Sequence, residues 1–299
     1  MKFLSVLLSN YGFFDDPYTL AGKGYHGEDK MSWLQFLVMG IIFVLIVVIS
    51  ILLRRVKREK VFLIYKILAI FMPINEIVKI TYSSYFDIIN GEPFNWGGIL
   101  PLYTCSMLMY FLPFVAWGKE NSKMKKYSMA FFTTIGLVAG LSNFVYLSAA
   151  SQYPVFTYGG MYSVIYHAVI VFVGMSLMIT GIYMPKDYKS INQAMIPILI
   201  FGALVLPLNF IIKAASGQGW TDYMMLMDTN GFPPFADWSD WLAQYNLRFL
   251  FSFFVLLVLY PIATALITYI DIGVGWLVKF FIKLFTKKKE TPTEETASN

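Results

Sequence analysis

The stretch WLQFLVMGIIFVLIVVISILL, from Trp33 to Leu53, decides the fold class of this 299-residue chain. It contains no charged residue, and a basic group follows it at once: Arg54, Arg55, Lys57, Arg58 and Lys60. A helix of about twenty apolar residues, rising 1.5 Å per residue, spans a hydrocarbon core of roughly 30 Å. The stretch therefore predicts a transmembrane helix that ends in a basic loop.

The rest of the chain repeats this pattern. With 58% apolar and only 14% charged residues, and a mean hydropathy of +0.61, the composition excludes a soluble enzyme. Further apolar stretches lie at 61–86, 99–117, 127–150, 161–184, 194–213 and 246–269. We therefore predict an all-α polytopic membrane protein, a bundle of seven transmembrane helices.

Basic residues predict the orientation of this bundle. Of the 23 Lys and Arg residues, sixteen fall in alternate loops and in the C-terminal region, whereas three precede the first span. Cytoplasmic loops carry the excess of Lys and Arg in membrane proteins. The predicted N-terminus is therefore external and the C-terminus cytoplasmic.

The predicted organisation has four parts. Residues 1–32 form an external amphipathic segment, 33–270 the seven-helix transmembrane domain, 271–286 an interfacial amphipathic helix and 287–299 a disordered cytoplasmic tail. The last external loop, 214–245, is rich in aromatic and acidic residues, which predicts that it folds back onto the membrane interface.

Several function classes are excluded by composition. The basic residues act as topology signals, so no nucleic-acid partner is expected. One cysteine and two histidines leave no metal site of the usual zinc pattern, and no metal or cofactor is expected. Membrane lipids are the expected partners, and the sequence does not indicate an oligomeric state.

Polar residues within the predicted spans lie at one depth. Six residues into their spans, Cys105 and His167 lie about 9 Å below the external helix ends. Other polar residues of the outer half are Glu76, Lys79, Asn143, Asn209, Lys213 and Arg248. Charged groups at such depth should face the bundle interior and form pairs, with Lys79 or Arg248 as partner of Glu76. We predict a polar site in the outer-leaflet half, with Glu76, Lys79, Lys213 and Arg248 as substrate-binding candidates.

Cys105 and His167 have the chemistry of a nucleophile and its base. An imidazole can take the proton of a thiol and create the thiolate that attacks a carbonyl carbon. The neighbouring side chains that can orient the imidazole or stabilise an oxyanion are Tyr103, Thr104, Asn143, Tyr166 and Asn209.

The chain resembles the YwaF-type integral membrane proteins of bacteria at these residues. The resemblance covers roughly 99–242 and rests on Leu100-Pro101-Leu102 followed by Cys105, on His167, and on Asn209 followed by Asp222-Tyr-Met-Met-Leu226. That family is distantly similar to eukaryotic seven-span phospholipid acyltransferases. The resemblance implies a multi-pass protein of the bacterial plasma membrane in which Cys105 accepts an acyl group and His167 is the base. Tyr103 stands where the resemblance leads us to expect a histidine.

Three functions are compatible with these observations. The first is a lipid acyltransferase or lipid hydrolase with a Cys105–His167 dyad. The second is a transporter or channel for a small solute or ion, with a polar site formed by Glu76, Lys79, His167 and Arg248. The third is a receptor or assembly factor that binds a partner through the aromatic loop.

Overall fold

The computed structural model describes residues 12–17, 33–92, 100–145, 156–216, 223–226 and 235–286. Every long element within these ranges is a helix, which confirms the predicted all-α class. In chain order the helices are α3 (Trp33–Leu53), α4 (Arg58–Asn90), α6 (Met107–Trp117), α7 (Lys123–Thr133), α8 (Ile135–Val145), α9 (Tyr158–Ile179), α10 (Tyr188–Ser216), the 3-10 turn η2 (Tyr223–Met225), α11 (Phe235–Gln244), α12 (Arg248–Phe254), the π-helical segment η3 (Val255–Leu259) and α13 (Tyr260–Thr286).

Some predicted features lie outside the described residues. These are the N-terminal segment 1–32 apart from 12–17, the tail 287–299, and residues 217–222 and 227–234 of the aromatic loop. The predicted interfacial segment 271–286 belongs to α13, which continues from Tyr260 to Thr286 as one helix.

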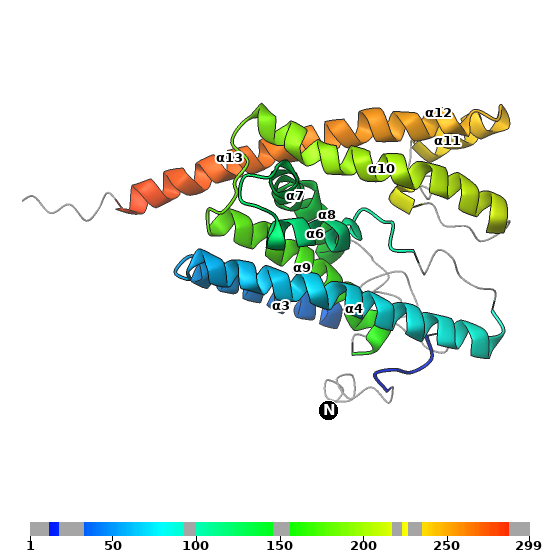
Figure 1. Cartoon of the computed structure of the whole chain (residues 1–299), viewed down its shortest axis with the longest axis horizontal. Coiled ribbons are helices and arrows are strands. Elements are labelled where there is room, and N and C mark those ends of the chain that lie inside the picture. The colour runs from blue at the N-terminus through cyan, green and yellow to red at the C-terminus, as the bar shows by residue number, and fades with distance from the viewer. Residues whose placement is uncertain are drawn as a thin grey trace, which may run out of the picture.

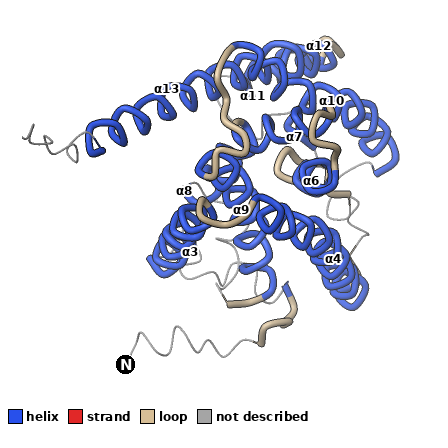
Figure 2. Tube along the Cα trace, turned by 60° about the vertical axis from the view of Figure 1, so that its left-hand side comes forward, coloured by secondary structure: helices blue, strands red, loops and turns tan. Residues whose placement is uncertain are grey.

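The helices form a bundle in which α6, α7 and α8 lie between the longer helices (Figure 1). Helices α3 and α4 flank α9 on one side, and α10 with α12 and α13 lies on the other (Figure 2). Helix α7 contacts α6, α8, α9 and α10, so it stands at the centre. Its buried residues Met129, Phe131 and Phe132 belong to the main hydrophobic core.

The central pass is broken rather than continuous. We predicted one span over 127–150, whereas the structure has α7 and α8 separated at Thr134, whose φ of −125° and ψ of −105° are not helical. The buried Thr134 hydroxyl donates to the carbonyl oxygen of Ala130 at 2.7 Å, so it leaves no orphaned polar group. A Cβ at Gly174 of α9 would lie 2.4 Å from the carbonyl oxygen of Phe132, so glycine permits this close packing.

Five helices in the described part of the chain are long and apolar enough to cross a membrane. They are Phe36–Leu53, Arg58–Asn90, Tyr158–Ile179, Tyr188–Ala215 and Arg248–Gly273. They correspond to the first, second, fifth, sixth and seventh predicted spans. The third predicted span contains only the short apolar helix α6, because residues 100–106 are not in a regular helix.

Candidate functional site

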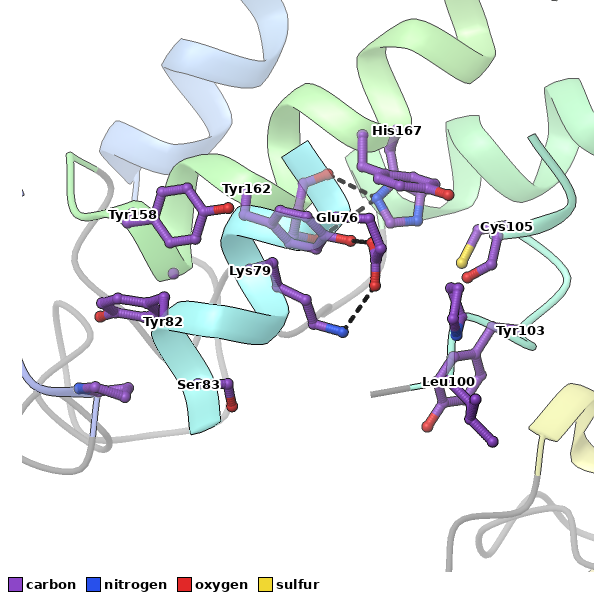
Figure 3. A pocket seen from close by; sticks show the side chains of 16 residues that line it. Glu76, Lys79, Tyr82, Ser83, Leu100, Tyr103, Cys105, Tyr158, Tyr162 and His167 are labelled. Carbon is purple, nitrogen blue, oxygen red and sulfur yellow. Dashed lines mark hydrogen bonds and ion pairs between the residues drawn. The ribbon is translucent and has the colours of Figure 1, made fainter. Parts of the chain in front are cut away.

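A cavity of about 320 Å³ lies between α4, the segment 100–106 and the start of α9. Figure 3 shows the 16 residues that line it. They are Pro17, Glu76, Lys79, Tyr82, Ser83, Leu100, Pro101, Tyr103, Cys105, Ser106, Tyr158, Gly159, Tyr162, Ser163, Tyr166 and His167. The structure thus brings Cys105 and His167 to one cavity with Glu76 and Lys79.

Helix α4 contributes a charged pair to the cavity. Glu76, Lys79 and Ser83 follow one another at spacings of three and four residues, which places them on one helix face. The Nζ of Lys79 donates to Oε1 of Glu76 at 3.1 Å, and the Tyr162 hydroxyl donates to Oε2 of the same carboxylate. Since Glu76 is 3% exposed, these two donors compensate a charge that would otherwise be costly to bury. The predicted pairing of Glu76 with Lys79 is therefore present.

Helix α9 contributes a row of tyrosines. Tyr158, Tyr162 and Tyr166 recur every four residues, and all three line the cavity. The Tyr158 hydroxyl donates to the backbone carbonyl oxygen of Asn75 at 3.0 Å, which ties α9 to α4. The Tyr166 hydroxyl is buried and has no hydrogen-bond partner within the described part of the chain. A buried donor without a partner is costly, which makes this hydroxyl at the cavity a candidate donor to a bound molecule.

His167 has a defined tautomer because of its contact one turn earlier in α9. Its Nδ1 lies 2.7 Å from the backbone carbonyl oxygen of Ser163. A carbonyl oxygen can only accept, so Nδ1 carries the proton, and in the neutral ring Nε2 is the basic nitrogen. His167 is 7% exposed, and this contact fixes the tautomer of its ring.

Cys105 lies in the non-helical segment that precedes α6. The segment continues through Ser106, and α6 begins at Met107. Cys105 is half-buried, and Figure 3 shows its sulfur directed into the space that Glu76 and His167 face from the other side. We predicted Cys105 six residues into a helix; the structure instead carries it on a loop at the cavity, next to Pro101, whose ring favours extended backbone before it.

The segment 12–17 covers one edge of the cavity. The backbone N–H of Tyr158 donates to the carbonyl oxygen of Phe13 at 2.7 Å, and the Tyr82 hydroxyl donates to the carbonyl oxygen of Asp15. Phe14 packs against Tyr158, with ring centroids 5.3 Å apart. Pro17 therefore reaches the cavity on a short piece of chain that α4 and α9 anchor.

Other predicted site residues lie away from this cavity. Asn209 of α10 is fully buried against Tyr223, and Thr104 bonds to Tyr260 instead of facing the cavity. Arg248 begins α12 and forms an ion pair with Asp240 at 3.1 Å. Lys213 lies in the last turn of α10, and the side chain of Asn143 lies outside what the structure describes. None of these side chains is part of the cavity lining that the structure describes.

Several cavity residues were missed by the sequence analysis. Tyr158, Tyr162 and Ser163 line the cavity beside the predicted His167, and Tyr82 and Ser83 line it beside Lys79. The spacing of three and four residues from Lys79 and from Tyr166 is a signal that would have found most of them. Within the described residues, no group of three or more His, Cys, Asp or Glu side chains could hold a metal ion.

The fold and this cavity define a class: a multi-pass helical membrane protein with a thiol, an imidazole and a buried ion pair around one cavity. The chain belongs to the TMEM164 family, a family of membrane proteins, whose family model matches residues 26–264. That match includes Glu76, Cys105 and His167. No curated protein and no solved structure matches the chain. The likeness to YwaF-type proteins and to acyltransferases stays a prediction.

Proposed function

We propose that this protein is a lipid acyltransferase or lipid hydrolase in which Cys105 is the nucleophile and His167 the base. The observation that carries the proposal is that both residues line one cavity of about 320 Å³. The bond from Nδ1 of His167 to the Ser163 carbonyl supports it further, because it makes Nε2 the basic nitrogen of the neutral ring, as a general base requires.

The reaction would proceed in two balanced steps. In the first, His167 Nε2 takes the Cys105 proton and the thiolate attacks an ester carbonyl carbon; the carbon–oxygen bond breaks, and the leaving alcohol takes the proton from His167. In the second, His167 takes a proton from an acceptor hydroxyl or from water, whose oxygen attacks the thioester. The carbon–sulfur bond then breaks, and the thiolate recovers the proton from His167.

The oxyanion formed in each step needs a hydrogen-bond donor. The Tyr166 hydroxyl supports such a role, because it is buried at the cavity and has no hydrogen-bond partner among the residues that the structure describes. Asn209 and Thr104, which we also considered for this role, are engaged on the other side of the Cys105 segment. We therefore assign oxyanion stabilisation to Tyr166.

A lipid is the proposed substrate because α4, which lines the cavity with one face, carries exposed apolar side chains on its other faces. Ile74 and Ile77 of α4 are more than half exposed, as expected for side chains that face hydrocarbon. Glu76 and Lys79 are retained as candidates for binding the polar part of the substrate. Arg248 and Lys213 are not given this role, since they lie outside the cavity lining.

Three turns support the proposed orientation, because basic residues lie in them or in the first turn of the helix that follows each of them. The turns 54–57, 118–122 and 180–187 lie at the same end of the bundle. Arg58, directly after the first turn, forms an ion pair with Glu120 of the second, and a second cavity of about 140 Å³ is lined by residues of the first and third turns. We infer that this end is cytoplasmic, and that α6 and the α7–α8 pair complete seven membrane crossings. The proposed location is the plasma membrane of a bacterium.

Lipid transfer in nanodiscs tests the proposed function. The purified protein is placed in phospholipid nanodiscs with one isotopically labelled acyl chain and a lysophospholipid acceptor, and labelled fatty acid and labelled new phospholipid are both measured. We expect one of these products from the wild type. We expect the rate to fall on the order of a thousandfold or more for Cys105→Ala. Ser142→Ala changes an exposed residue of α8 and is the matched control.

The same preparation distinguishes an enzyme from a transporter. If Cys105→Ala forms product at the wild-type rate, the proposed chemistry is wrong. If in addition a labelled solute crosses proteoliposomes and Glu76→Gln stops this flux, the polar site serves transport instead.

A further inference from the structure

The segment 100–106 that carries Cys105 is held from behind by a connected set of polar contacts. The Thr104 hydroxyl and the Tyr260 hydroxyl lie 3.0 Å apart, and the Tyr260 hydroxyl donates to the backbone carbonyl oxygen of Met224 at 2.9 Å. One residue before Thr104, the ring of Tyr103 packs edge-on against that of Tyr223, with centroids 5.3 Å apart. Tyr103 therefore contacts η2 directly, and Thr104 is connected to η2 through the side chain of Tyr260.

The anchor at η2 is itself fixed by α10. The Asn209 side chain donates through Nδ2 to the Tyr223 carbonyl oxygen at 2.9 Å and accepts from the Tyr223 N–H at 3.1 Å. Asn209 and Tyr223 are both fully buried. The Asn209 side chain thus satisfies both backbone groups of Tyr223, which in a helix or strand would bond to other backbone groups. These two hydrogen bonds restrict the backbone of η2 beside α10 (Figure 1).

Met224 is held in an unusual backbone conformation. Its φ of 60° and ψ of 13° lie in the left-handed region, which disfavours a residue with a long side chain. Such conformations persist only where the surroundings determine them, and they gather near functional sites. Here the left-handed conformation of Met224 is stabilised by the two hydrogen bonds between Asn209 and Tyr223 and by the hydrogen bond from Tyr260 to Met224.

The position of Tyr260 depends on the π-helical segment η3. The N–H of Tyr260 bonds to the carbonyl oxygen of Val255, five residues earlier, which defines a π turn. One extra residue in the turn rotates every later side chain by about 100° relative to an uninterrupted α-helix. A Cβ at Gly202 of α10 would lie 2.3 Å from Leu256, so the two helices meet closely at this turn. The π turn therefore sets the direction in which the Tyr260 hydroxyl points.

We propose that Tyr260 and Thr104 are positioning residues, which hold the Cys105 segment against η2 so that the sulfur keeps its place in the cavity. This set of residues is called the support wall: Asn209, Tyr223, Met224 and Tyr260, with Thr104 as its contact on the Cys105 segment. The proposal rests on the proposed function for the role of Cys105, but the contacts it invokes are independent of the substrate.

The unique cysteine makes the proposal measurable without any lipid substrate. The rate at which N-ethylmaleimide alkylates Cys105 reports how often the segment opens, because Cys105 is half-buried. Tyr260→Phe removes the hydroxyl that contacts both Thr104 and Met224. We expect alkylation to become about three- to tenfold faster, the change that the loss of one or two ordinary hydrogen bonds gives. Tyr269→Phe, an exposed tyrosine of the same helix, is the matched control and should alkylate at the wild-type rate.

Variants at Thr104 test whether the two hydroxyls act together. Thr104→Val should accelerate alkylation like Tyr260→Phe, whereas Thr104→Ser keeps a hydroxyl and should restore the wild-type rate. The double variant Thr104→Val with Tyr260→Phe should be no faster than the faster single variant, because both changes break one connection. If the acceleration in the double variant equals the product of the two single accelerations, the proposal is overturned. It is also overturned if each single variant is alkylated at a rate within twofold of the wild type.

Turnover separates positioning from a general loss of structure. In the nanodisc assay Tyr260→Phe should lower kcat about three- to tenfold with KM unchanged, while the thermal unfolding midpoint in detergent stays near that of Tyr269→Phe. Slower turnover with faster alkylation is the expected pair of changes. If alkylation accelerates only with a lowered unfolding midpoint, Tyr260 serves overall stability and the proposal is wrong. If Cys105→Ala keeps full activity, the proposed function fails, while alkylation still decides whether Tyr260 positions the segment.

Discussion

The two sides of the Cys105 segment use polar residues in opposite ways. On one side is the cavity wall, formed by Glu76, Lys79, Tyr162, Tyr166 and His167. On the other is the support wall, where the Asn209 amide meets both backbone groups of Tyr223. The cavity wall borders open volume, and its Tyr166 hydroxyl has no hydrogen-bond partner among the described residues. In the support wall, the Tyr260 hydroxyl and the Asn209 amide both bond to protein groups.

This difference shows that a shared depth in the membrane does not make one site. From the sequence, Asn209 and His167 are equivalent members of a polar layer. In the structure, His167 faces a cavity, whereas the Asn209 side chain bonds to the backbone N–H and carbonyl of Tyr223 in η2. Polar residues in membrane proteins serve both purposes, and only the partner of each atom tells them apart.

The largest expected effect is on activity and falls on the cavity wall. His167→Ala removes the proposed base and should lower turnover by about a hundred- to ten-thousandfold. It should also lower the unfolding midpoint, because His167 is 7% exposed and loss of its ring leaves a void; the loss of turnover should remain at temperatures where the variant is folded. Turnover in nanodiscs and thermal unfolding in detergent measure the two quantities. Unchanged turnover would remove His167 from the mechanism.

The second effect is on stability and falls on the support wall. Asn209→Leu leaves the buried N–H and carbonyl of Tyr223 without these partners, at a cost of about 1–3 kcal/mol for each group. We expect a clearly lowered midpoint of unfolding in denaturing detergent. Asn192→Leu, in the first turns of the same helix, is the control for loss of an amide. If Asn209→Leu unfolds like the wild type, the two walls do not differ in the way described.

A smaller effect is expected where α10 meets η3. Gly202→Ala would place a methyl group 2.3 Å from Leu256 Cδ1, and because that atom ends a flexible side chain, we expect a cost of about 1–2 kcal/mol. Gly202→Ala with Leu256→Ala should recover part of the loss, since the second change removes the obstructing atom. Unfolding in denaturing detergent measures both variants. A double variant less stable than the sum of its singles would contradict this packing.

The smallest effect is expected at Arg248, outside both walls. Its ion pair with Asp240 is at the surface, where the Asp240 side chain is 69% exposed, so Asp240→Asn should cost less than about 1 kcal/mol. Turnover should stay within twofold of the wild type, because neither residue lines the cavity. A large loss of turnover for Asp240→Asn would return Arg248 to the candidate site, as the sequence analysis proposed.

The helical class could be predicted from the sequence, and so could a polar site that contains Glu76, Lys79, Cys105 and His167. Apolar length predicts the spans, and the cost of buried charge predicts that Glu76 pairs with Lys79. Their three-residue spacing also brings their side chains to one face of α4. For Cys105 and His167, the guides were equal depth and the family resemblance, and both applied equally to Asn209.

The remaining features depend on backbone irregularities that carry no periodic signal. Thr134 breaks the central pass, Met224 takes a left-handed conformation and Tyr260 follows a π turn. Each departure is stabilised by contacts from distant parts of the chain, such as Asn209 to Tyr223. Local propensity cannot predict them, because the contacts that stabilise them form only in the folded bundle.

The most direct test of the account is to look for an acyl group on Cys105. The protein is incubated in nanodiscs with a phospholipid that bears an alkyne-tagged acyl chain, quenched in acid, digested and analysed by peptide mass spectrometry. We predict the tagged chain on the peptide that contains Cys105, lost on treatment with neutral hydroxylamine and absent from Cys105→Ala. Cys105→Ser should give either no adduct or one that resists hydroxylamine, because an oxyester is less reactive than a thioester. Product formation without an adduct on Cys105 in the wild type, or an adduct that persists in Cys105→Ala, would contradict the account.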